Sequence, residues 1–172
     1  DPDLFVLNGG ANLMLRDDGG HFTDVTAVMG IVGDEGDYGN SMSFADWDGD
    51  GDLDAYLANG EEEWDPQNQV ANAPDRLYRQ DAPGVFTDVS HLIPHDNRRG
   101  AGFVAGWSDW DHDGDPDLYV VNDFGNVVSN QMFRNDGPSA TDDWTFTVIT
   151  ETCGCNLADA GMGLGIGDYD RD

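Results

Sequence analysis

The amino-acid sequence predicts an all-β protein built from repeated units of antiparallel strands. An acidic nonapeptide at residues 46–54 recurs at residues 109–117, which is 63 positions later. Between these copies lie short runs of β-branched and aromatic residues bounded by Gly, Asn and Asp, a pattern typical of strands. The longest apolar runs are only about a strand long, and no segment shows a helical pattern.

Other segments also recur in a fixed order between the acidic copies. Residues 12–16 resemble 75–79 and 130–134, and each is followed by a Phe-Thr segment, at 21–26, 85–90 and 145–150 respectively. Each repeat therefore reads as strand, acidic loop, strand, connection, strand, turn, strand. Four strands per unit of about 60 residues favour β-propeller-like blades over a helical solenoid.

We expect about three blades' worth of structure. The predicted division is a partial blade at 1–41, repeats at 42–102 and 103–162, and the start of another repeat at 163–172. Residues 17–20 and 135–137 have the composition of tight turns. The predicted strands are 4–8, 12–17, 21–26, 42–47, 54–59, 75–80, 85–90, 103–110, 117–122, 130–135, 144–150 and 163–168.

The charge of the chain is strongly acidic. Seven basic residues against 35 acidic ones give a net charge of −28, which disfavours contact with nucleic acid or anionic membranes. No apolar run approaches the roughly 20 residues of a membrane span. A solvated acidic coat is one interpretation. However, Asp outnumbers Glu by 30 to 5, and ten Asp lie in the two nonapeptides, so cation binding is the better one.

The acidic loops have the composition of a calcium site. Asp at loop positions 1, 3 and 5 offers three carboxylates on one side of a tight turn, and Gly at position 6 lets the backbone reverse. Position 7 can offer a carbonyl, and Asp at position 9 closes the set. Calcium accepts such an irregular all-oxygen site better than magnesium does. Two carboxylates about 5 Å apart repel by roughly 3 kcal/mol at a dielectric near 20, so the empty loop is costly.

The loop differs from other calcium motifs. Position 12 is Leu57 or Val120 rather than the Glu of an EF-hand, and the nonapeptide of calcium β-rolls is absent. The pattern Asp-x-Asp-x-Asp-Gly-x-x-Asp, with Phe-Thr-Asp-Val segments between copies, resembles the FG-GAP/VCBS repeats of integrin α-like β-propellers. That resemblance implies calcium ligands at Asp46, Asp48, Asp50, Asp52 (carbonyl) and Asp54, and at Asp109, Asp111, Asp113, Asp115 (carbonyl) and Asp117.

Two half-loops extend this set. Asp168, Asp170 and Asp172 would begin a third site, and Asp1 and Asp3 would end another. We expect each half-loop to be completed either by neighbouring residues of a longer chain or by another copy. In the second case the two half-loops of different copies share a cation, and self-assembly gives rings or filaments.

The chain carries no recognisable catalytic motif, so we predict that it is not an enzyme. The long connections at 27–41, 60–74, 91–102, 123–129 and 151–162 are candidate contact surfaces for a protein or glycan ligand. Side chains suited to such contacts there are Glu61, Glu62, Glu63, Trp64, Arg98 and Arg99.

We therefore expect an extracellular or cell-surface calcium-binding module for structure or adhesion, with a surface filament as one form. The alternatives are a carbohydrate-binding propeller and the calcium-stabilised domain of a secreted enzyme.

The sequence leaves two smaller structural features undecided. Cys153 and Cys155 can form a local disulfide, a bridge to another segment or free thiols. Trp47, Trp110 and Tyr169, at loop position 2, suit packing between blades better than sugar stacking.

Overall fold

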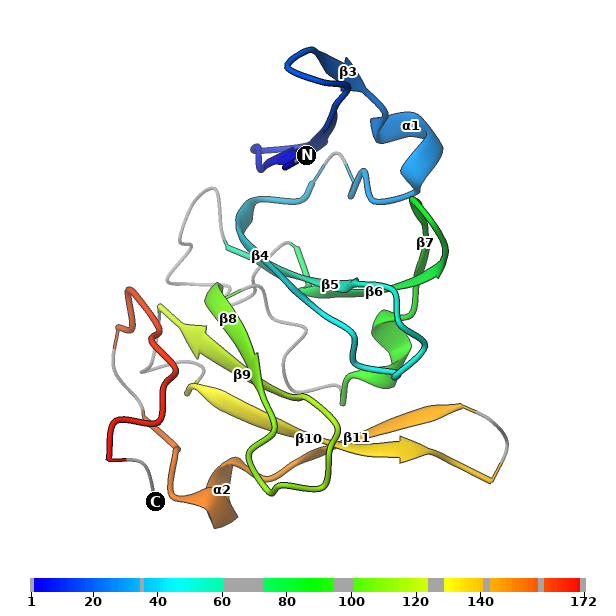
Figure 1. Cartoon of the computed structure of the whole chain (residues 1–172). Coiled ribbons are helices and arrows are strands. Elements are labelled where there is room, and N and C mark those ends of the chain that lie inside the picture. The colour runs from blue at the N-terminus through cyan, green and yellow to red at the C-terminus, as the bar shows by residue number, and fades with distance from the viewer. Residues whose placement is uncertain are drawn as a thin grey trace.

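The computed structural model describes residues 2–34, 36–60, 73–94, 101–123, 129–140, 143–157 and 160–170. These residues form three antiparallel sheets (Figure 1). Sheet 1 contains β1 (Leu4–Val6), β2 (Leu13–Asp17) and β3 (Phe22–Asp24). Sheet 2 contains β4 (Gly39–Ala45), β5 (Asp54–Asn59), β6 (Arg76–Ala82) and β7 (Val85–Asp88). Sheet 3 contains β8 (Gly102–Ser108), β9 (Asp117–Asn122), β10 (Gln131–Pro138) and β11 (Trp144–Val148).

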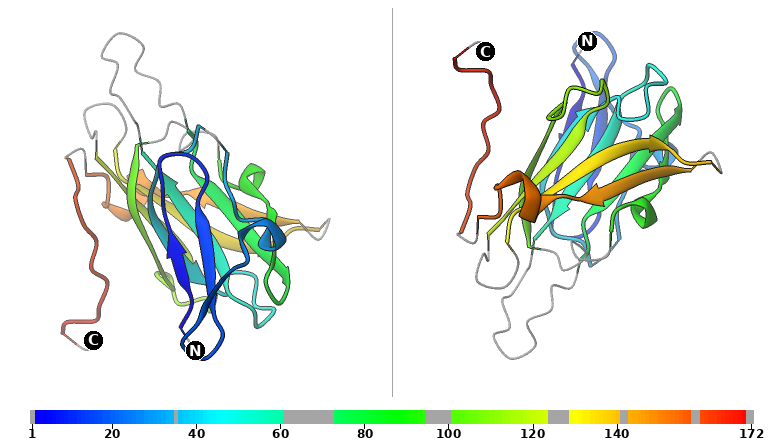
Figure 2. Two further views of the ribbon diagram at one scale, coloured as in Figure 1. Left: turned by 90° about the horizontal axis from the view of Figure 1, so that it is seen from above. Right: turned by 90° about the horizontal axis from the view of Figure 1, so that it is seen from below.

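Strands are neighbours in chain order within every sheet, which confirms the predicted all-β fold with propeller-like blades. The sheets stack on one another, and Figure 2 shows the stack from two sides. β5 is buried at every position because both of its faces are covered. Ala55 and Leu57 pack in the cluster shared with sheet 1, whereas Tyr56 and Ala58 pack in the cluster shared with sheet 3.

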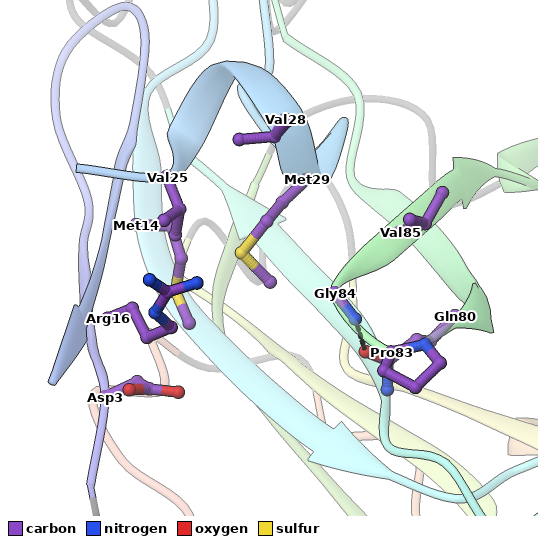
Figure 3. Close-up of a pocket in the computed structure, with 10 residues that line it drawn as sticks. All are labelled: Asp3, Met14, Arg16, Val25, Val28, Met29, Gln80, Pro83, Gly84 and Val85. Carbon is purple, nitrogen blue, oxygen red and sulfur yellow. Dashed lines mark hydrogen bonds between the residues drawn. The ribbon is translucent and has the colours of Figure 1, made fainter. Parts of the chain in front are cut away.

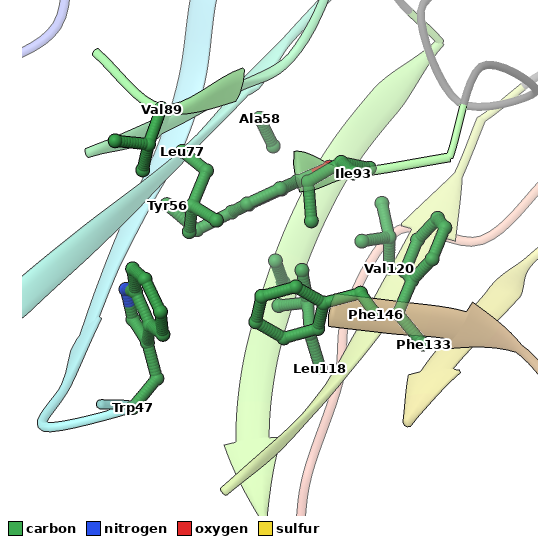
Figure 4. Close-up of a cluster of buried hydrophobic side chains, with 11 residues drawn as sticks. Trp47, Tyr56, Ala58, Leu77, Val89, Ile93, Leu118, Val120, Phe133 and Phe146 are labelled. Atoms are coloured by element: carbon green, nitrogen blue, oxygen red, sulfur yellow. The ribbon is translucent and has the colours of Figure 1, made fainter. Parts of the chain in front are cut away.

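Two apolar clusters fill the spaces between the sheets. Between sheets 1 and 2, the buried residues are Ile31, Ala55, Leu57, Tyr78 and Phe86. Between sheets 2 and 3, a larger cluster includes Trp47, Tyr56, Leu77, Leu118, Phe133 and Phe146 (Figure 4). Burial of such side chains between neighbouring sheets is the main favourable term for this stack.

Three one-turn helices follow the last strand of each sheet, although the sequence shows no helical pattern. They are α1 (Thr26–Met29), η1 (Ser90–Leu92) and α2 (Thr150–Cys153). In each, the hydroxyl of the first residue accepts a hydrogen bond from a backbone N–H of the preceding sheet's last strand but one, at Met14 of β2, Leu77 of β6 and Met132 of β10 respectively. A single turn is too short to produce a periodic pattern, which is why the sequence did not predict it.

Two local predictions are wrong. Residues 163–168 are not a strand: the segment lies extended beside sheet 3 without a ladder partner in the described part of the chain. Residues 135–137 are not a turn, because β10 continues through them with an irregularity in its pairing to β11. Gly137, with φ of 72°, absorbs that irregularity, and the hairpin closes further on, where Ser139 N–H donates to the Asp143 carbonyl at 2.7 Å. Residues 17–20 do form the predicted turn between β2 and β3.

One arrangement recurs at the edge of each sheet. An Asn at or just beyond the end of β1, β5 or β9 donates its backbone N–H to an Asn or Asp side chain that precedes β2, β6 or β10, at 3.1, 2.7 and 2.9 Å respectively. A glycine that introduces the next blade lies against that same side chain. The three sets are Asn8, Asn12 and Gly39; Asn59, Asp75 and Gly102; and Asn122, Asn130 and Gly161.

In the described part of the chain, no helix has the length and apolar character needed to span a bilayer.

Candidate metal centre

Two acidic loops join the first and second strands of sheets 2 and 3, as the sequence predicts. Residues 46–53 join β4 to β5, and residues 109–116 join β8 to β9. Gly51 and Gly114 at loop position 6 have φ of 97° and 102°. Position 4 also lies in the left-handed region, with φ of 72° at Gly49 and 61° at His112, a feature that sequence reasoning missed. These dihedrals fold each loop into a tight coil.

In the first loop, three carboxylates converge. Oxygens of Asp46, Asp48 and Asp50 all lie within 4.8 Å of one another. Asp46 Oδ2 accepts a hydrogen bond from Gly51 N–H at 3.1 Å, which fixes the carboxylate in place. Asp46 Oδ1 is buried and has no hydrogen-bond partner among the residues that the structure describes. Burial raises the pKa of Asp48, and its carboxylate neighbours add to the shift. The arrangement concentrates negative charge around one point and leaves a buried oxygen for a ligand.

The second loop repeats most of this geometry. Oxygens of Asp109, Asp111 and Asp117 lie within 4.8 Å of one another. Asp109 Oδ2 accepts from Gly114 N–H at 3.2 Å, as Asp46 does from Gly51. The two groups thus share positions 1 and 3, whereas the third carboxylate comes from position 5 in the first loop and from position 9 in the second. Asp113 is exposed and is not part of the second group.

The Asp at loop position 9 also accepts hydrogen bonds from the backbone, which the sequence did not predict. Asp54 accepts from Trp47 N–H at 3.1 Å and from Gln80 N–H at 2.8 Å. Asp117 accepts in the same way from Trp110 at 2.9 Å and Asn135 at 2.8 Å. Both carboxylates are fully buried. Each therefore ties its loop to the third strand of its own blade.

The electrostatics of position 9 favour a nearby cation. Burial raises the pKa of Asp54 to about 7, and the carboxylates of Asp48 and Asp50 contribute to the same direction. Burial likewise raises the pKa of Asp117. A carboxylate held in a desolvated place beside other carboxylates is destabilised in its charged form, and a divalent ion among them would offset that cost.

Position 7 lies at the turn back into the strand. Asp52 N–H donates to Asp50 Oδ1 at 2.9 Å, and Asp115 N–H donates to Asp113 Oδ1 at 3.0 Å. Burial, followed by its acidic neighbours, raises the pKa of Asp115. The use of the carbonyls at position 7 as ligands stays a prediction.

The described residues of the two half-loops are not brought together. Asp168 and Asp170 are exposed near the C-terminal end and Asp3 is exposed near the N-terminal end, and Figure 1 shows these two ends of the chain far apart, on opposite sides of the stack. None of these three belongs to either carboxylate group. Asp3 does repeat the position 9 bond, since it accepts from Asp17 N–H at 2.8 Å. Asp1 and Asp172 lie outside the described residues.

The aromatic residue at loop position 2 packs between blades in the first loop. Trp47 is fully buried and makes edge contacts with Trp144 and Phe146 of sheet 3, with ring centroids 5.5 and 5.6 Å apart (Figure 4). This confirms the packing interpretation for Trp47. Trp110 is 49% exposed and Tyr169 is 93% exposed, so neither side chain is buried between blades in the described part of the chain.

Two other features lie away from the loops. Cys153 and Cys155 form a local disulfide across Gly154, which decides between the alternatives left by the sequence. A cavity of about 510 Å³ opens between sheet 1, α1 and the β6–β7 turn, with Met14 and Met29 on one side and Pro83 on the other (Figure 3). The candidate contact residues Glu61, Glu62, Glu63, Trp64, Arg98 and Arg99 lie outside the described residues.

The chain matches the family described as FG-GAP-like repeat over residues 1–57 and 68–120, which is more than half of its length. No curated protein matches it.

Proposed function

We propose a calcium-binding structural role outside the cell for this chain, which belongs to the FG-GAP-like repeat family. Repeats of this family are commonly extracellular, and they are typically structural or binding modules. The proposed role is non-catalytic: the acidic loops hold calcium, and the ions stiffen a stack of blades used for adhesion or assembly.

The buried, unpartnered Asp46 Oδ1 is the observation that carries the proposal. A buried acceptor without a hydrogen bond costs about 1–3 kcal/mol, and more when it is charged. Its neighbours, Asp48 and Asp50, are carboxylates and cannot donate to it when ionised. An ion among the three groups would satisfy the oxygen and neutralise the repulsion at once.

The chemistry of the donor set favours calcium. Every group that could hold the ion is a carboxylate, and the third carboxylate comes from different positions in the two loops. Calcium takes six to eight oxygens in flexible geometry, whereas magnesium requires near-ideal octahedral ligands. Extracellular calcium modules bind at about 10⁻⁴–10⁻³ M, which suits a secreted protein.

Each ion would act on more than its own loop. The carboxylates that would hold the ion belong to the same coiled loop as Asp54 at position 9. Asp54 accepts hydrogen bonds from the backbone N–H groups of Trp47 and of Gln80 in β6. Trp47 in turn packs against sheet 3. Fixing the coil therefore fixes the Trp47 side chain between two sheets.

Terbium luminescence provides a direct test, because Trp47 and Trp110 lie within the loops and can sensitise a bound lanthanide. We expect saturable emission that calcium displaces with a stoichiometry of two ions. Asp48→Asn should remove about half of the amplitude. The matched control is Asp143→Asn, an exposed acid outside both loops, which should leave the titration unchanged. Equal emission from wild type and from a variant carrying both Asp48→Asn and Asp111→Asn would refute the proposal.

A further inference from the structure

An arginine recurs at one position in the last strand but one of each sheet. The chain contains only seven basic residues against 35 acidic ones, and three of the seven occupy this position. They are Arg16 in β2, Arg79 in β6 and Arg134 in β10. A recurring positive charge in so acidic a chain calls for a physical reason, which the neighbours of these side chains supply.

Two side chains hold each of these guanidinium groups. Arg79 Nε donates to Asp81 Oδ1 at 2.7 Å, and Asp81 Oδ2 accepts from the hydroxyl of Thr87. Thr87 lies opposite Arg79 on the neighbouring strand β7. The same bonds join Arg16 to Asp18 and Asp18 to Thr23, and Arg134 to Asp136 and Asp136 to Thr147. We call each set of Arg, Asp and Thr an arginine clamp, because the fixed carboxylate restricts the conformations open to the arginine.

The register of sheet 2 places Arg79 beside the first acidic loop. Ala55 of β5 pairs with Tyr78 of β6, so one step further along both strands Asp54 lies opposite Arg79. The bond from Gln80 N–H to Asp54, at 2.8 Å, holds the two strands together at that point. Residues directly opposite on antiparallel strands share a face. Position 9 of the first loop therefore has a positive charge as its cross-strand neighbour.

Sheet 3 repeats this arrangement at the second loop. Leu118 of β9 pairs with Phe133 of β10, and the next step sets Asp117 opposite Arg134. The bond from Asn135 N–H to Asp117, at 2.8 Å, matches the corresponding bond of sheet 2. Two loops that differ in their third carboxylate therefore share the same neighbouring arginine.

Sheet 1 carries the same pair. Leu4 of β1 pairs with Leu15 of β2, so Asp3 lies opposite Arg16. Figure 3 shows these two side chains next to each other. Asp3 also accepts from Asp17 N–H at 2.8 Å. The arginine thus lies beside the position 9 acid in all three sheets.

The charges of the first loop and of Arg79 act on each other. The hydrogen bond to Asp81 is the main reason why the pKa of Arg79 is raised, and the carboxylates of Asp48 and Asp54 raise it further. Burial raises the pKa of Asp48, and the charge of Arg79 opposes that shift. Arg134 stands in the same relation to the acids at positions 3 and 9 of the second loop. Each arginine is therefore close enough to stabilise the ionised carboxylates of its loop.

The stability of an exposed ion pair does not explain this placement. The side chains of Arg79 and Asp81 are 33% and 38% exposed, and pairs of that kind add little to stability because water screens them. The effect on the loop is different, because a bound divalent ion would bring two more positive charges beside the arginine. Charges of one sign repel, so the arginine favours the empty loop over the loop with its ion.

We propose that Arg79 and Arg134 are built-in counter-ions of the two acidic loops, which stabilise the loops without calcium and lower their affinity for it. This regulation rests on the proposed calcium-binding function. A unit charge about 7 Å from a divalent ion, in a dielectric like that of water, changes the affinity roughly eightfold. An effect of that size moves a loop toward the range of about 10⁻⁴–10⁻³ M at which extracellular calcium modules bind.

Calcium titration calorimetry with one loop silenced tests this regulation. Asp111→Asn disables the second loop, so that the titration reports the first loop alone. Adding Arg79→Met, which keeps an apolar stem and removes the charge, should raise the affinity for calcium about fivefold to tenfold. Adding Arg134→Met instead is the matched control and should change the affinity by less than about twofold.

The control is suitable because Arg134 points away from the first loop. Phe133 packs in the cluster between sheets 2 and 3, and the side chain of Asn135 donates to Trp47 of the first loop. Successive side chains of a strand point to opposite faces, so Arg134 lies on the other face of sheet 3. The reciprocal experiment, with Asp48→Asn as the background, should exchange the roles of the two arginines.

Further measurements separate the charge of the arginine from its packing. Arg79→Lys keeps the charge and should bind calcium within about twofold of its parent. The gain from Arg79→Met should shrink at 1 M salt, where the screening length falls to about 3 Å. By linkage, Arg79→Met should destabilise the protein more in chelator than in saturating calcium, because the empty loop loses its counter-ion. Circular dichroism checks that every variant is folded.

The outcomes distinguish this regulation from the calcium site itself. If wild type binds calcium and Arg79→Met binds it no more tightly, the counter-ion role is overturned and the proposed function stands. A gain that Arg134→Met reproduces in the same background, or that high salt leaves unchanged, would also overturn it. Wild type that binds no calcium would refute the proposed function, and the regulation of the loops with it.

Discussion

The side-chain amide of Asn135 donates a 2.7 Å hydrogen bond to the backbone carbonyl of Trp47, joining two residues that lie 88 positions apart. The bond runs from β10 of sheet 3 to the acidic loop of sheet 2, and both residues are fully buried. The same Asn135 offers its backbone N–H to Asp117 of the second loop. One residue therefore couples the two acidic loops through the core between their sheets.

Replacement of Asn135 should destabilise the whole stack. Asn135→Ala leaves the buried Trp47 carbonyl without a partner, which costs about 1–3 kcal/mol in the free energy of unfolding. Urea denaturation followed by tryptophan fluorescence measures this loss. Asn156→Ala, at an exposed Asn that donates to the nearby Glu151, is the control and should change stability by less than about 0.5 kcal/mol. Equal stability of the two variants would mean that the bond does not contribute.

Calcium removal should lower the melting temperature. An ion that binds only the folded state, at 100 times its dissociation constant, adds about 2.7 kcal/mol per site. Differential scanning calorimetry with calcium and then with excess chelator measures the difference, and added magnesium should restore little of it. A melting curve unaffected by chelator would contradict a structural role for the two loops.

Two positions of one loop should respond differently to the same substitution. Asp54→Ala removes the acceptor of Trp47 N–H and Gln80 N–H, so it should destabilise the folded state by about 1–3 kcal/mol for each donor left buried. Asp52→Ala keeps its backbone carbonyl and should change stability by less than about 0.5 kcal/mol. Chemical denaturation in saturating calcium compares the two. The prediction fails if Asp52→Ala is the more damaging change.

The buried ion pair between Arg76 and Asp37, outside the loops, should also be sensitive to loss of one partner. Arg76 contacts buried Asp37 through two nitrogens, at 2.7 and 2.9 Å, and these bonds raise the pKa of Arg76. Arg76→Met leaves the Asp37 charge buried, which typically costs about 3–5 kcal/mol. Adding Asp37→Leu to that variant should recover part of the loss. Arg134→Met, at an exposed pair with Asp136, should cost less than about 1 kcal/mol in the same urea titration.

The sequence predicted the blades and loops because their signals are local. Asp46, Asp48 and Asp50 alternate within five residues, so the turn that joins their strands also brings their carboxylates together. Strand order followed from the repeat alone. The buried Trp47 was predictable as packing because a large aromatic recurs at a fixed loop position.

Hydrogen bonds between residues far apart in the chain could not be predicted from the sequence. The link from Asp54 to Gln80 spans 26 positions, and nothing in the nonapeptide indicates that position 9 serves the third strand. The segment at 163–168 has strand-like alternation, but a strand also needs a hydrogen-bonded neighbour, which composition does not supply. The left-handed backbone of His112 was not predicted from the sequence, because a non-glycine residue is uncommon in that region.

The junction built from Asn12 and Gly39, and repeated at Asp75 and Gly102, has a consequence for how such proteins change over generations. Each blade carries an Asn or Asp side chain that accepts a hydrogen bond within the blade, and the glycine that begins the next blade lies against that side chain. A recombination event that copies or deletes one whole unit thus joins compatible surfaces without further mutation. Blade number can drift by duplication, while a substitution at a junction glycine is disfavoured in every copy because any side chain there would meet the neighbouring Asn or Asp.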